Sequence, residues 1–281
     1  MFLLVLFILI QVVLEALPVS SSGHLALFKL FLMEKFKIVF FMPEFFDDFL
    51  HGSAVLIILV LFFKDWFLPF KYLINSFNHN KKRFKLFLNL LFKIISLVLV
   101  VDSITAAFYF LYHKSFADGV TNNPSYFLIV GFSITTVLLI FLYIKEKYFI
   151  SRIESFDFKK AIILGFVQGV ALFPGISRFA STYVVLRLLN LSVRRAFQIS
   201  FLVQFPLILA GFARGAYCLF KDESAKVILS PAILFILFLA SIVSYFLLKF
   251  TYKLAKQNRL WIFCIYTLFI VFIILFCFFI F

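Results

Sequence analysis

The chain has 281 residues, of which 64% are hydrophobic and 21% aromatic, and it carries a formal net charge of +14. Soluble globular domains are about 45–50% apolar, so this composition excludes an ordinary soluble domain and indicates a polytopic membrane protein. A charge this positive is also typical of nucleic-acid binding. Here, however, the basic residues lie between apolar segments, so we interpret them as cytoplasmic flanks of membrane spans and expect no nucleic-acid partner.

The first polar interruption of the chain is the segment 11–24, which reads QVVLEALPVSSSGH. Gln11 and Glu15 are four residues apart and therefore share one face of a helix, which Pro18 ends. The residues that follow are Ser20, Ser21, Ser22, Gly23 and His24. Polar and ionisable groups are costly at membrane depth, so this cluster indicates a functional site. The alternative is a helix end whose serines cap the next helix.

The apolar segments on either side of this cluster are too short to span a membrane. Residues 1–17 and 24–33 each fall below the roughly 20 apolar residues that a spanning helix needs. We therefore expect a re-entrant helix hairpin, whose turn is buried in protein or lines a wet cavity. Three longer apolar segments follow at about 46–63, 86–112 and 125–144, and a strongly basic loop is predicted over 64–85.

The opening pattern then recurs. A second short apolar segment, 161–173, ends at Pro174, and a polar turn and another short apolar piece follow before three more spans at about 196–220, 228–248 and 260–281. We predict an all-α integral membrane helix bundle, a single domain over 1–281. In it, a re-entrant hairpin plus three transmembrane helices occurs twice, in pseudo-repeats 1–144 and 161–281 joined by a basic cytoplasmic loop, 145–160.

Three spans between the two hairpins place them on opposite sides of the membrane. This is an inverted repeat, whose two polar turns are expected to meet near the midplane. If the basic segment 64–85 is cytoplasmic, then 145–160, 187–195 and 249–259 are cytoplasmic too, and the four stretches hold 18 of the 27 Lys and Arg residues. This bias agrees with the positive-inside rule and predicts that the first hairpin opens toward the outer face.

Arg178 occupies the place in the second turn that Glu15 has in the first. A guanidinium cannot be neutralised by losing its proton, so burying one calls for an anionic partner, which is either Glu15 or a phosphate. Gly175 lets the backbone approach such a ligand, and the hydroxyls of Ser177 and Thr182 can donate to it. This set of groups is suited to phosphoryl transfer, which depends on positioning and charge stabilisation.

Several roles remain open for the acidic and imidazole groups. Glu15, with Gln11, is suited either to hold a divalent metal or to act as a base. His24 is suited to be the nucleophile, the base or the leaving-group acid, and a serine that attacks with His24 as its base is a further alternative. Asp47 and His51 open the third apolar segment as accessory candidates, and interfacial solvation explains them equally well.

The segment 11–24 resembles the first motif of the undecaprenyl-diphosphate phosphatase family, the bacitracin-resistance protein type. That motif is Glu or Gln, three residues, Glu, and then Leu-Pro-Val-Ser-Ser-Ser/Thr-Gly-His, and the match has no gap. The second motif, Pro-Gly-x-Ser-Arg-Ser-Gly-x-Thr, is matched except that Phe179 and Ala180 replace Ser and Gly, which removes one hydroxyl beside Arg178. Phe46-Asp47 with Leu50-His51 is similar to a weaker family pattern.

The resemblance implies an enzyme of the bacterial cytoplasmic (inner) membrane that hydrolyses undecaprenyl diphosphate to undecaprenyl phosphate and inorganic phosphate. Such an enzyme recycles the lipid carrier for peptidoglycan synthesis and confers bacitracin resistance. The resemblance also implies a divalent metal, Mg²⁺ or Ca²⁺, an outward-facing site and a homodimer.

By motif position we expect catalytic roles for Glu15, His24, Arg178 and Ser21, with Gln11 and Glu15 as metal ligands. The residues expected to bind the phosphate or the substrate are Ser20, Ser22, Gly23, Gly175, Ser177 and Thr182.

Two other functions compete with this interpretation. A polyprenyl-phosphate transporter or flippase would use the same inverted-repeat cavity, because discontinuous helices are common in transporters. The other class of membrane lipid phosphatase also carries Ser-Gly-His and Ser-Arg, but it needs a second histidine six residues after its arginine. That position is Val184 here, so this class does not fit.

Overall fold

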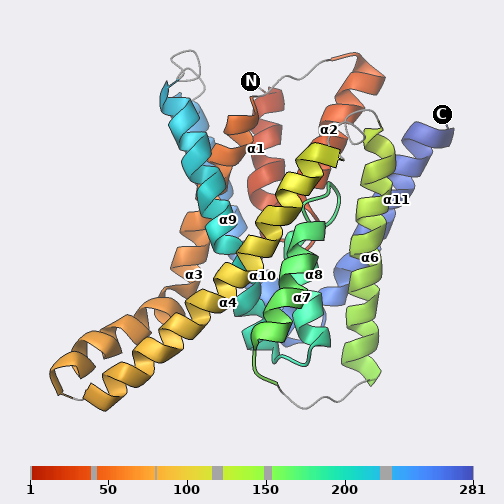
Figure 1. Cartoon of the computed structure of the whole chain (residues 1–281). Coiled ribbons are helices and arrows are strands. Elements are labelled where there is room, and N and C mark those ends of the chain that lie inside the picture. The colour runs from red at the N-terminus through yellow and green to blue at the C-terminus, as the bar shows by residue number, and fades with distance from the viewer. Residues whose placement is uncertain are drawn as a thin grey trace.

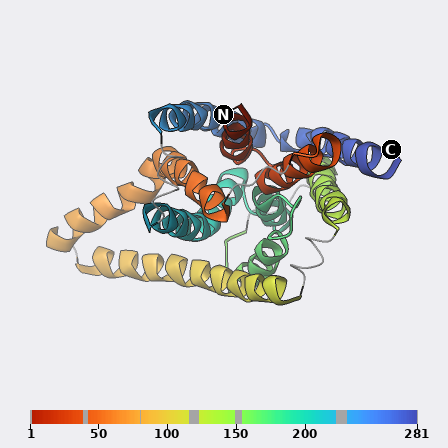
Figure 2. The same ribbon diagram turned by 90° about the horizontal axis from the view of Figure 1, so that it is seen from above.

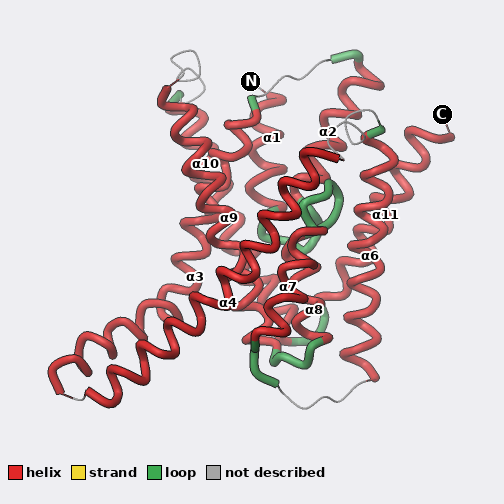
Figure 3. Tube along the Cα trace, viewed as in Figure 1, coloured by secondary structure: helices red, strands yellow, loops and turns green. Residues whose placement is uncertain are grey.

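The structure is a computed structural model, and it describes residues 2–38, 43–79, 81–115, 123–148, 154–221 and 230–280. Within these ranges the chain forms ten α-helices and no strand (Figures 1 and 3). The helices are α1 (Phe2–Leu14), α2 (Ser21–Phe36), α3 (Glu44–His79), α4 (Lys81–Ser115), α6 (Pro124–Tyr148), α7 (Phe158–Val170), α8 (Arg178–Leu188), α9 (Val193–Lys221), α10 (Pro231–Lys256) and α11 (Phe263–Leu275).

Six helical segments are long and apolar enough to cross a membrane. They are Phe45–Trp66, Phe84–Tyr112, Pro124–Tyr148, Val193–Lys221, Pro231–Lys256 and Leu260–Phe278. These segments coincide with the six predicted spans, so the prediction of a multi-pass, all-α membrane protein is confirmed. The other four helices, α1, α2, α7 and α8, are only 11 to 16 residues long and pair as two hairpins.

The basic segment 64–85 was predicted as a loop, and this prediction is wrong. It is helical almost throughout, because α3 runs to His79 and α4 begins at Lys81. The two helices extend away from the bundle as an arm, at the lower left of Figure 1 and the left of Figure 2. The stretch contains no glycine, five lysines and four phenylalanines, and a helix tolerates both of these residue types. Polarity alone does not distinguish a solvated helix from a loop.

The hairpins enter the bundle from opposite ends. In Figure 1 the N terminus lies at the top and α1 descends from it, whereas α7 begins near the bottom and rises. The turns after α1 and after α7 lie in the middle of the bundle, as the central loops of Figure 3 show. The two polar segments that the sequence analysis marked as candidate functional segments therefore lie at mid-depth in the bundle, away from either end of the molecule.

Helices α3 and α9 pack along one another beside these turns. Arg214 of α9 donates through Nε to Asp48 of α3 at 2.7 Å, and Arg194 donates through Nη2 to Asp65 at 2.7 Å, nearer the other end of the same pair. Helix α1 packs against α10, α7 packs against α4, and α6 packs against α11. Each hairpin is thus supported by a long helix from the other half of the chain.

Candidate active site

The turns of the two hairpins meet at a pair of glycines. A Cβ on Gly23 would lie 2.7 Å from the Cα of Gly175 and 2.8 Å from its backbone nitrogen. Gly175 has a φ of +88°, and a Cβ there would lie 2.9 Å from the backbone nitrogen of Phe132. Only residues without a Cβ permit backbones to approach this closely. The approach brings two segments about 150 residues apart in sequence to one place.

Replacing Gly175 by alanine should therefore lower the free energy of unfolding by about 1–2 kcal/mol or more, since a left-handed backbone alone costs that much for a residue with a Cβ. The measurement is the thermal midpoint of the purified protein in detergent. Gly211→Ala is the matched control, because a Cβ there has 3.5 Å to its nearest neighbour, the Cδ2 of His51. Equal midpoints for the two variants would contradict the close approach described here.

The first turn presents its serines through a strained residue. Ser20 has φ 65° and ψ 85°, a left-handed conformation, and its Oγ accepts from the backbone nitrogen of Gly23 at 3.2 Å. Ser20 is thus the N-cap of α2, as the alternative interpretation of the serines required. Ser21 and Ser22 stand at the start of α2 and line a cavity, so capping and lining a site coexist in this turn.

The second turn is held by a threonine that the sequence analysis did not select. Thr135 of α6 donates through Oγ1 to the carbonyl of Gly175 at 2.9 Å and accepts from the backbone nitrogen of Ser177 at 3.0 Å. Ser177 caps α8 through its Oγ, which accepts from the nitrogen of Ala180. These contacts fix the start of α8, where Arg178 is the first residue.

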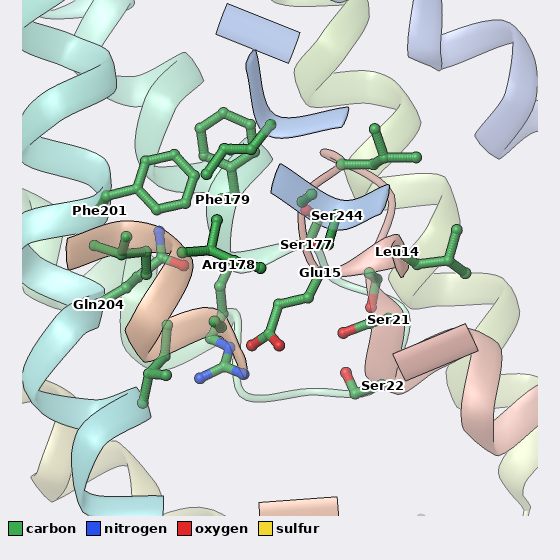
Figure 4. Close-up of a pocket in the computed structure, with 18 of the residues that line it drawn as sticks. Leu14, Glu15, Ser21, Ser22, Ser177, Arg178, Phe179, Phe201, Gln204 and Ser244 are labelled. Carbon is green, nitrogen blue, oxygen red and sulfur yellow. The ribbon is translucent and has the colours of Figure 1, made fainter. Parts of the chain in front are cut away.

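The two turns and the neighbouring helices enclose a cavity of about 50 Å³ (Figure 4). Its polar walls come from both hairpins and from α9 and α10 and comprise Glu15, Ser20, Ser21, Ser22, Ser177, Arg178, Gln204 and Ser244. The remaining lining is apolar and includes Phe179, Phe201 and Ile57. Of the expected catalytic residues, Glu15, Ser21 and Arg178 line this one cavity and His24 does not.

Glu15 is oriented by a histidine from α3. His51 donates through Nδ1 to Glu15 Oε1 at 2.7 Å, and both side chains are 13% exposed. The second carboxylate oxygen, Glu15 Oε2, is buried and has no hydrogen-bond partner. The contact therefore fixes one oxygen of Glu15 and leaves the other available to a ligand. His51, an accessory candidate from the sequence, is in direct contact with an expected catalytic residue.

Arg178 points into the cavity beside Glu15, as the close-up in Figure 4 shows. Among the described residues no carboxylate forms an ion pair with its guanidinium. Of the two anionic partners considered from the sequence, the structure therefore does not use Glu15 as a direct ion-pair partner. A cation that lines a half-buried cavity in this way is well placed to bind an anion from outside the protein.

Comparison with known proteins assigns this chain to a family. The sequence model of the family described as "Bacitracin resistance protein BacA" matches residues 4–273. This chain belongs to the BacA family. Similar proteins named "Undecaprenyl-diphosphatase" occur in Borrelia hermsii (30% identity, covering 96% of both chains) and Leptospira biflexa (27%, covering 88% of this chain and 85% of the relative). Another occurs in a Thermotoga species (28%, covering 93% and 94%).

His24 of this BacA chain is turned away from the cavity. Its Nδ1 lies 2.7 Å from the carbonyl oxygen of Ser20 and its Nε2 lies 2.8 Å from the hydroxyl of Tyr266. The ring is stacked on Tyr266, with 5.6 Å between centroids, and meets the edge of Phe132 at 5.0 Å. In this arrangement both ring nitrogens of His24 are already engaged by the protein.

Thr182, expected to bind substrate, is also engaged inside the protein. Its Oγ1 donates to the carbonyl of Arg178 at 2.8 Å and accepts from Nε2 of Gln204 at 3.1 Å. Thr182 is fully buried and does not line the cavity. Gln204, which the sequence analysis did not select, lines the cavity and connects α9 to the turn of α8 that follows Arg178.

Phe179, where this chain departs from the family motif, packs within a cluster of aromatic side chains. Its ring lies 4.8 Å from Phe201 and 5.3 Å from Phe197, both on α9, and 5.9 Å from Tyr183. The ring is 4% exposed and forms an apolar wall of the cavity. Arg178 therefore loses a neighbouring hydroxyl, but the helix that carries it gains packing against α9.

Three buried acceptor oxygens suit a divalent cation. Gln11 Oε1, Glu15 Oε2 and Asp47 Oδ1 have no hydrogen-bond partner in the protein. Hard oxygen ligands of this kind are those that Mg²⁺ and Ca²⁺ prefer. No group of three acidic, histidine or cysteine side chains is arranged to hold a metal among the described residues. Mg²⁺ commonly takes only one or two carboxylates and completes its shell with water and substrate phosphate.

Proposed function

We propose that this protein hydrolyses undecaprenyl diphosphate to undecaprenyl phosphate and inorganic phosphate at the cavity between the two hairpin turns. The observation that carries the proposal is the meeting of Glu15, Ser21, Ser177 and Arg178 around one cavity in a chain of the BacA family. The relatives in Borrelia, Leptospira and Thermotoga carry the name of this activity. In cells the same reaction would recycle the lipid carrier for peptidoglycan synthesis and confer bacitracin resistance.

The terminal phosphate is held by charge and by helix ends. Arg178 offers a planar fork of donors to phosphate oxygens. Helices α2 and α8 both begin at the cavity, with Ser21 and Arg178 as first residues, and a helix N-terminus favours an anion through its free N–H groups. A diphosphate needs more room than the roughly one or two waters that 50 Å³ accommodates. Binding of the substrate would therefore require the cavity to widen.

Glu15 is the base in this mechanism. Its free oxygen, Oε2, takes the proton of the attacking group, which is a water or the hydroxyl of Ser21, while His51 holds Oε1. The attacking oxygen bonds to the terminal phosphorus, and the bond from that phosphorus to the bridging oxygen breaks. Attack by water gives inorganic phosphate directly, whereas attack by Ser21 gives a phosphoserine that a water must then hydrolyse to release inorganic phosphate. Undecaprenyl phosphate leaves with the bridging oxygen, and Arg178 stabilises the charge that develops on the terminal phosphoryl group.

A divalent metal, Mg²⁺ or Ca²⁺, would be held by Gln11 and Glu15, with Asp47 as a third oxygen source. Because Oε2 of Glu15 cannot bind the metal and take the proton at once, the metal-binding and base roles of Glu15 are alternatives. When bound it would neutralise the charge of the diphosphate and so supply electrostatic stabilisation to the phosphoryl transfer. The support for this assignment is the set of buried, unpartnered oxygens on these three side chains.

An apolar groove beside the cavity suits the lipid tail. It has a volume of about 700 Å³, is lined by α3, α9 and α10, and is open at its outer edge, where Phe238 and Phe246 are exposed. Ile57 lines both the cavity and the groove, and on α10 Ser244 lines the cavity one turn from Ser241 in the groove. The first isoprene units of the substrate would lie here while its diphosphate reaches Arg178.

Filling this groove should impair long-chain substrates selectively. Val60 lies on the groove wall with its side chain 62% exposed, and Val60→Trp would place an indole there. The KM for undecaprenyl diphosphate should then rise by about tenfold, because the lipid tail loses roughly 1.4 kcal/mol of apolar contact with the groove. The KM for farnesyl diphosphate should rise less. Val137→Trp on α6, outside the groove, is the control. An equal effect on both substrates, or none, would refute the placement of the tail.

The architecture supports an inverted repeat with an outward-facing site in the bacterial cytoplasmic membrane. Helix α1 packs on α10, and α7 packs on α4. If a two-fold axis between α3 and α9 relates the two halves, α1 corresponds to α7 and α10 to α4, so these two contacts are equivalent. The ion pairs Asp48–Arg214 and Asp65–Arg194 are then also related. The excess of Lys and Arg in the predicted cytoplasmic segments supports an orientation in which the mouth of the first hairpin lies on the outer face.

The test of the function is phosphate release by the purified protein in detergent, supplied with undecaprenyl diphosphate and Mg²⁺. We expect turnover that chelation of the metal abolishes. If no phosphate is released by folded protein, while liposomes containing it move polyprenyl phosphate between leaflets, the carrier function considered from the sequence is correct and hydrolysis is not.

A further inference from the structure

The surroundings of His24 define which of its nitrogens carries a proton. A backbone carbonyl can only accept, so Nδ1 of His24 must donate to the Ser20 oxygen that lies 2.7 Å away. In the neutral ring Nε2 is then a bare acceptor, and the Tyr266 hydroxyl at 2.8 Å donates to it. Tyr266 comes from α11, the last helix of the chain, and no motif in the sequence pointed to it.

The contact between the His24 ring and the Ser20 carbonyl supports the backbone of the first turn. It accepts from the backbone nitrogen of His24 at 3.2 Å as well as from the ring. Ser20 itself is left-handed, which costs a residue with a Cβ about 1–2 kcal/mol. The His24 ring therefore stabilises a strained residue directly before Ser21 and Ser22, which line the cavity together with Ser20.

From this geometry we infer that His24 and Tyr266 are positioning residues. Tyr266 orients the ring of His24, the ring holds the carbonyl of Ser20, and this fixes the Ser21 hydroxyl toward the cavity. The attacking group is then a water or a serine activated by Glu15, and the imidazole does not react with phosphorus. This inference rests on the proposed phosphatase function and goes beyond it by assigning Tyr266 and by excluding His24 as nucleophile.

A comparison of three substitutions of His24 tests the inference. The amide nitrogen of an asparagine stands where Nδ1 stands and can donate to the Ser20 carbonyl, but it can neither attack phosphorus nor transfer a proton. His24→Asn should therefore keep kcat within about tenfold of the parent, whereas His24→Ala should lose about a hundredfold or more. His24→Gln, whose amide reaches too far, should resemble alanine. If folded His24→Asn is as inactive as His24→Ala, the imidazole reacts and the inference is wrong.

Tyr266→Phe gives a readout that does not depend on activity. It keeps the stacked ring but removes the hydroxyl, so nitrogen NMR of histidine-labelled protein should show the Nδ1–H tautomer in the parent and a mixture in the variant. The His24 signals are identified by their loss in His24→Asn. We expect kcat to fall severalfold with KM unchanged. Tyr126→Phe, on an exposed tyrosine of α6, is the control.

The outcomes separate the two proposals. A tautomer that does not change in Tyr266→Phe, together with an unchanged kcat, overturns the role of Tyr266. Absence of turnover in the parent protein overturns the phosphatase function, while the tautomer measurement still reports on the contact itself.

Discussion

Arg178→Ala should reduce kcat/KM for undecaprenyl diphosphate by about a hundredfold or more, because one preorganised charged donor contributes roughly 3 kcal/mol to transition-state stabilisation. The side chain lines the cavity and has no ion-pair partner among the described residues, so its charge is available to the substrate. Arg178→Lys should recover part of the loss, since it restores the charge without the bidentate geometry. The measurement is kcat/KM of the parent protein and both variants, obtained from phosphate release under steady-state conditions.

Arg194→Ala is the matched control for this prediction. Arg194 is 66% exposed and pairs with Asp65 at the surface of α3, away from the cavity, so its loss should change kcat/KM by no more than about twofold. If Arg178→Ala stays folded, judged by its thermal midpoint, and retains near-parental turnover, the phosphate is bound elsewhere and the proposed site is wrong.

The spans and the two hairpins could be predicted because membrane burial leaves a strong local pattern. Long apolar runs mark the six spans, and the prolines and serines of the two turns interrupt runs that are too short to cross. The helical structure of the basic segment 64–85 could not be predicted in this way. Apolar length identifies a span, but it carries no information on whether the charged continuation of a span stays helical, as α3 does to His79.

The composition of the cavity could be predicted only in part. Glu15, Ser21 and Arg178 were found because each stands in a polar turn within an apolar run. Thr135 and Tyr266 act on the turns from α6 and α11, where a hydroxyl side chain in a spanning helix has no local signature of such a contact. Such contacts join residues 40 or more positions apart, so they appear only once the helices are packed.

The direction of the His24 ring shows a second limit of sequence patterns. A motif places an imidazole beside the serines, and helical geometry places its backbone correctly in the first turn of α2. Which way the ring points depends on Tyr266 and Phe132, which approach from two other helices. A motif can thus identify a residue that matters and still leave open whether it reacts or positions its neighbours.

The same reasoning applies to Phe179. From the motif alone, the loss of a hydroxyl next to Arg178 suggests a weaker phosphate site. The structure shows that the position faces α9, where Phe197 and Phe201 surround the ring. The substitution therefore changes the packing behind Arg178, and the arginine is carried on a helix that is well anchored in the core.

Glu15→Gln should lower kcat by about two to four orders of magnitude, the range over which a positioned general base contributes. The change keeps the shape of the side chain, and the amide oxygen can still accept from His51 Nδ1, so the fold and the cavity wall should be preserved. What is lost is the charge on the second oxygen, Oε2, which is buried and unpartnered. Without it the attacking water or serine keeps its proton.

Glu34→Gln is the matched control, because Glu34 is an exposed carboxylate on α2 and its substitution repeats the same chemical change outside the cavity. Measuring kcat across a range of Mg²⁺ concentrations separates two roles of Glu15. If excess Mg²⁺ restores the Glu15→Gln variant, the carboxylate serves mainly to bind metal. If kcat stays low at saturating Mg²⁺, it is the base. If Glu15→Gln has the parental kcat at every Mg²⁺ concentration, Glu15 takes no part in the reaction. The mechanism in which His51 holds one oxygen of this carboxylate so that the other can act would then be wrong.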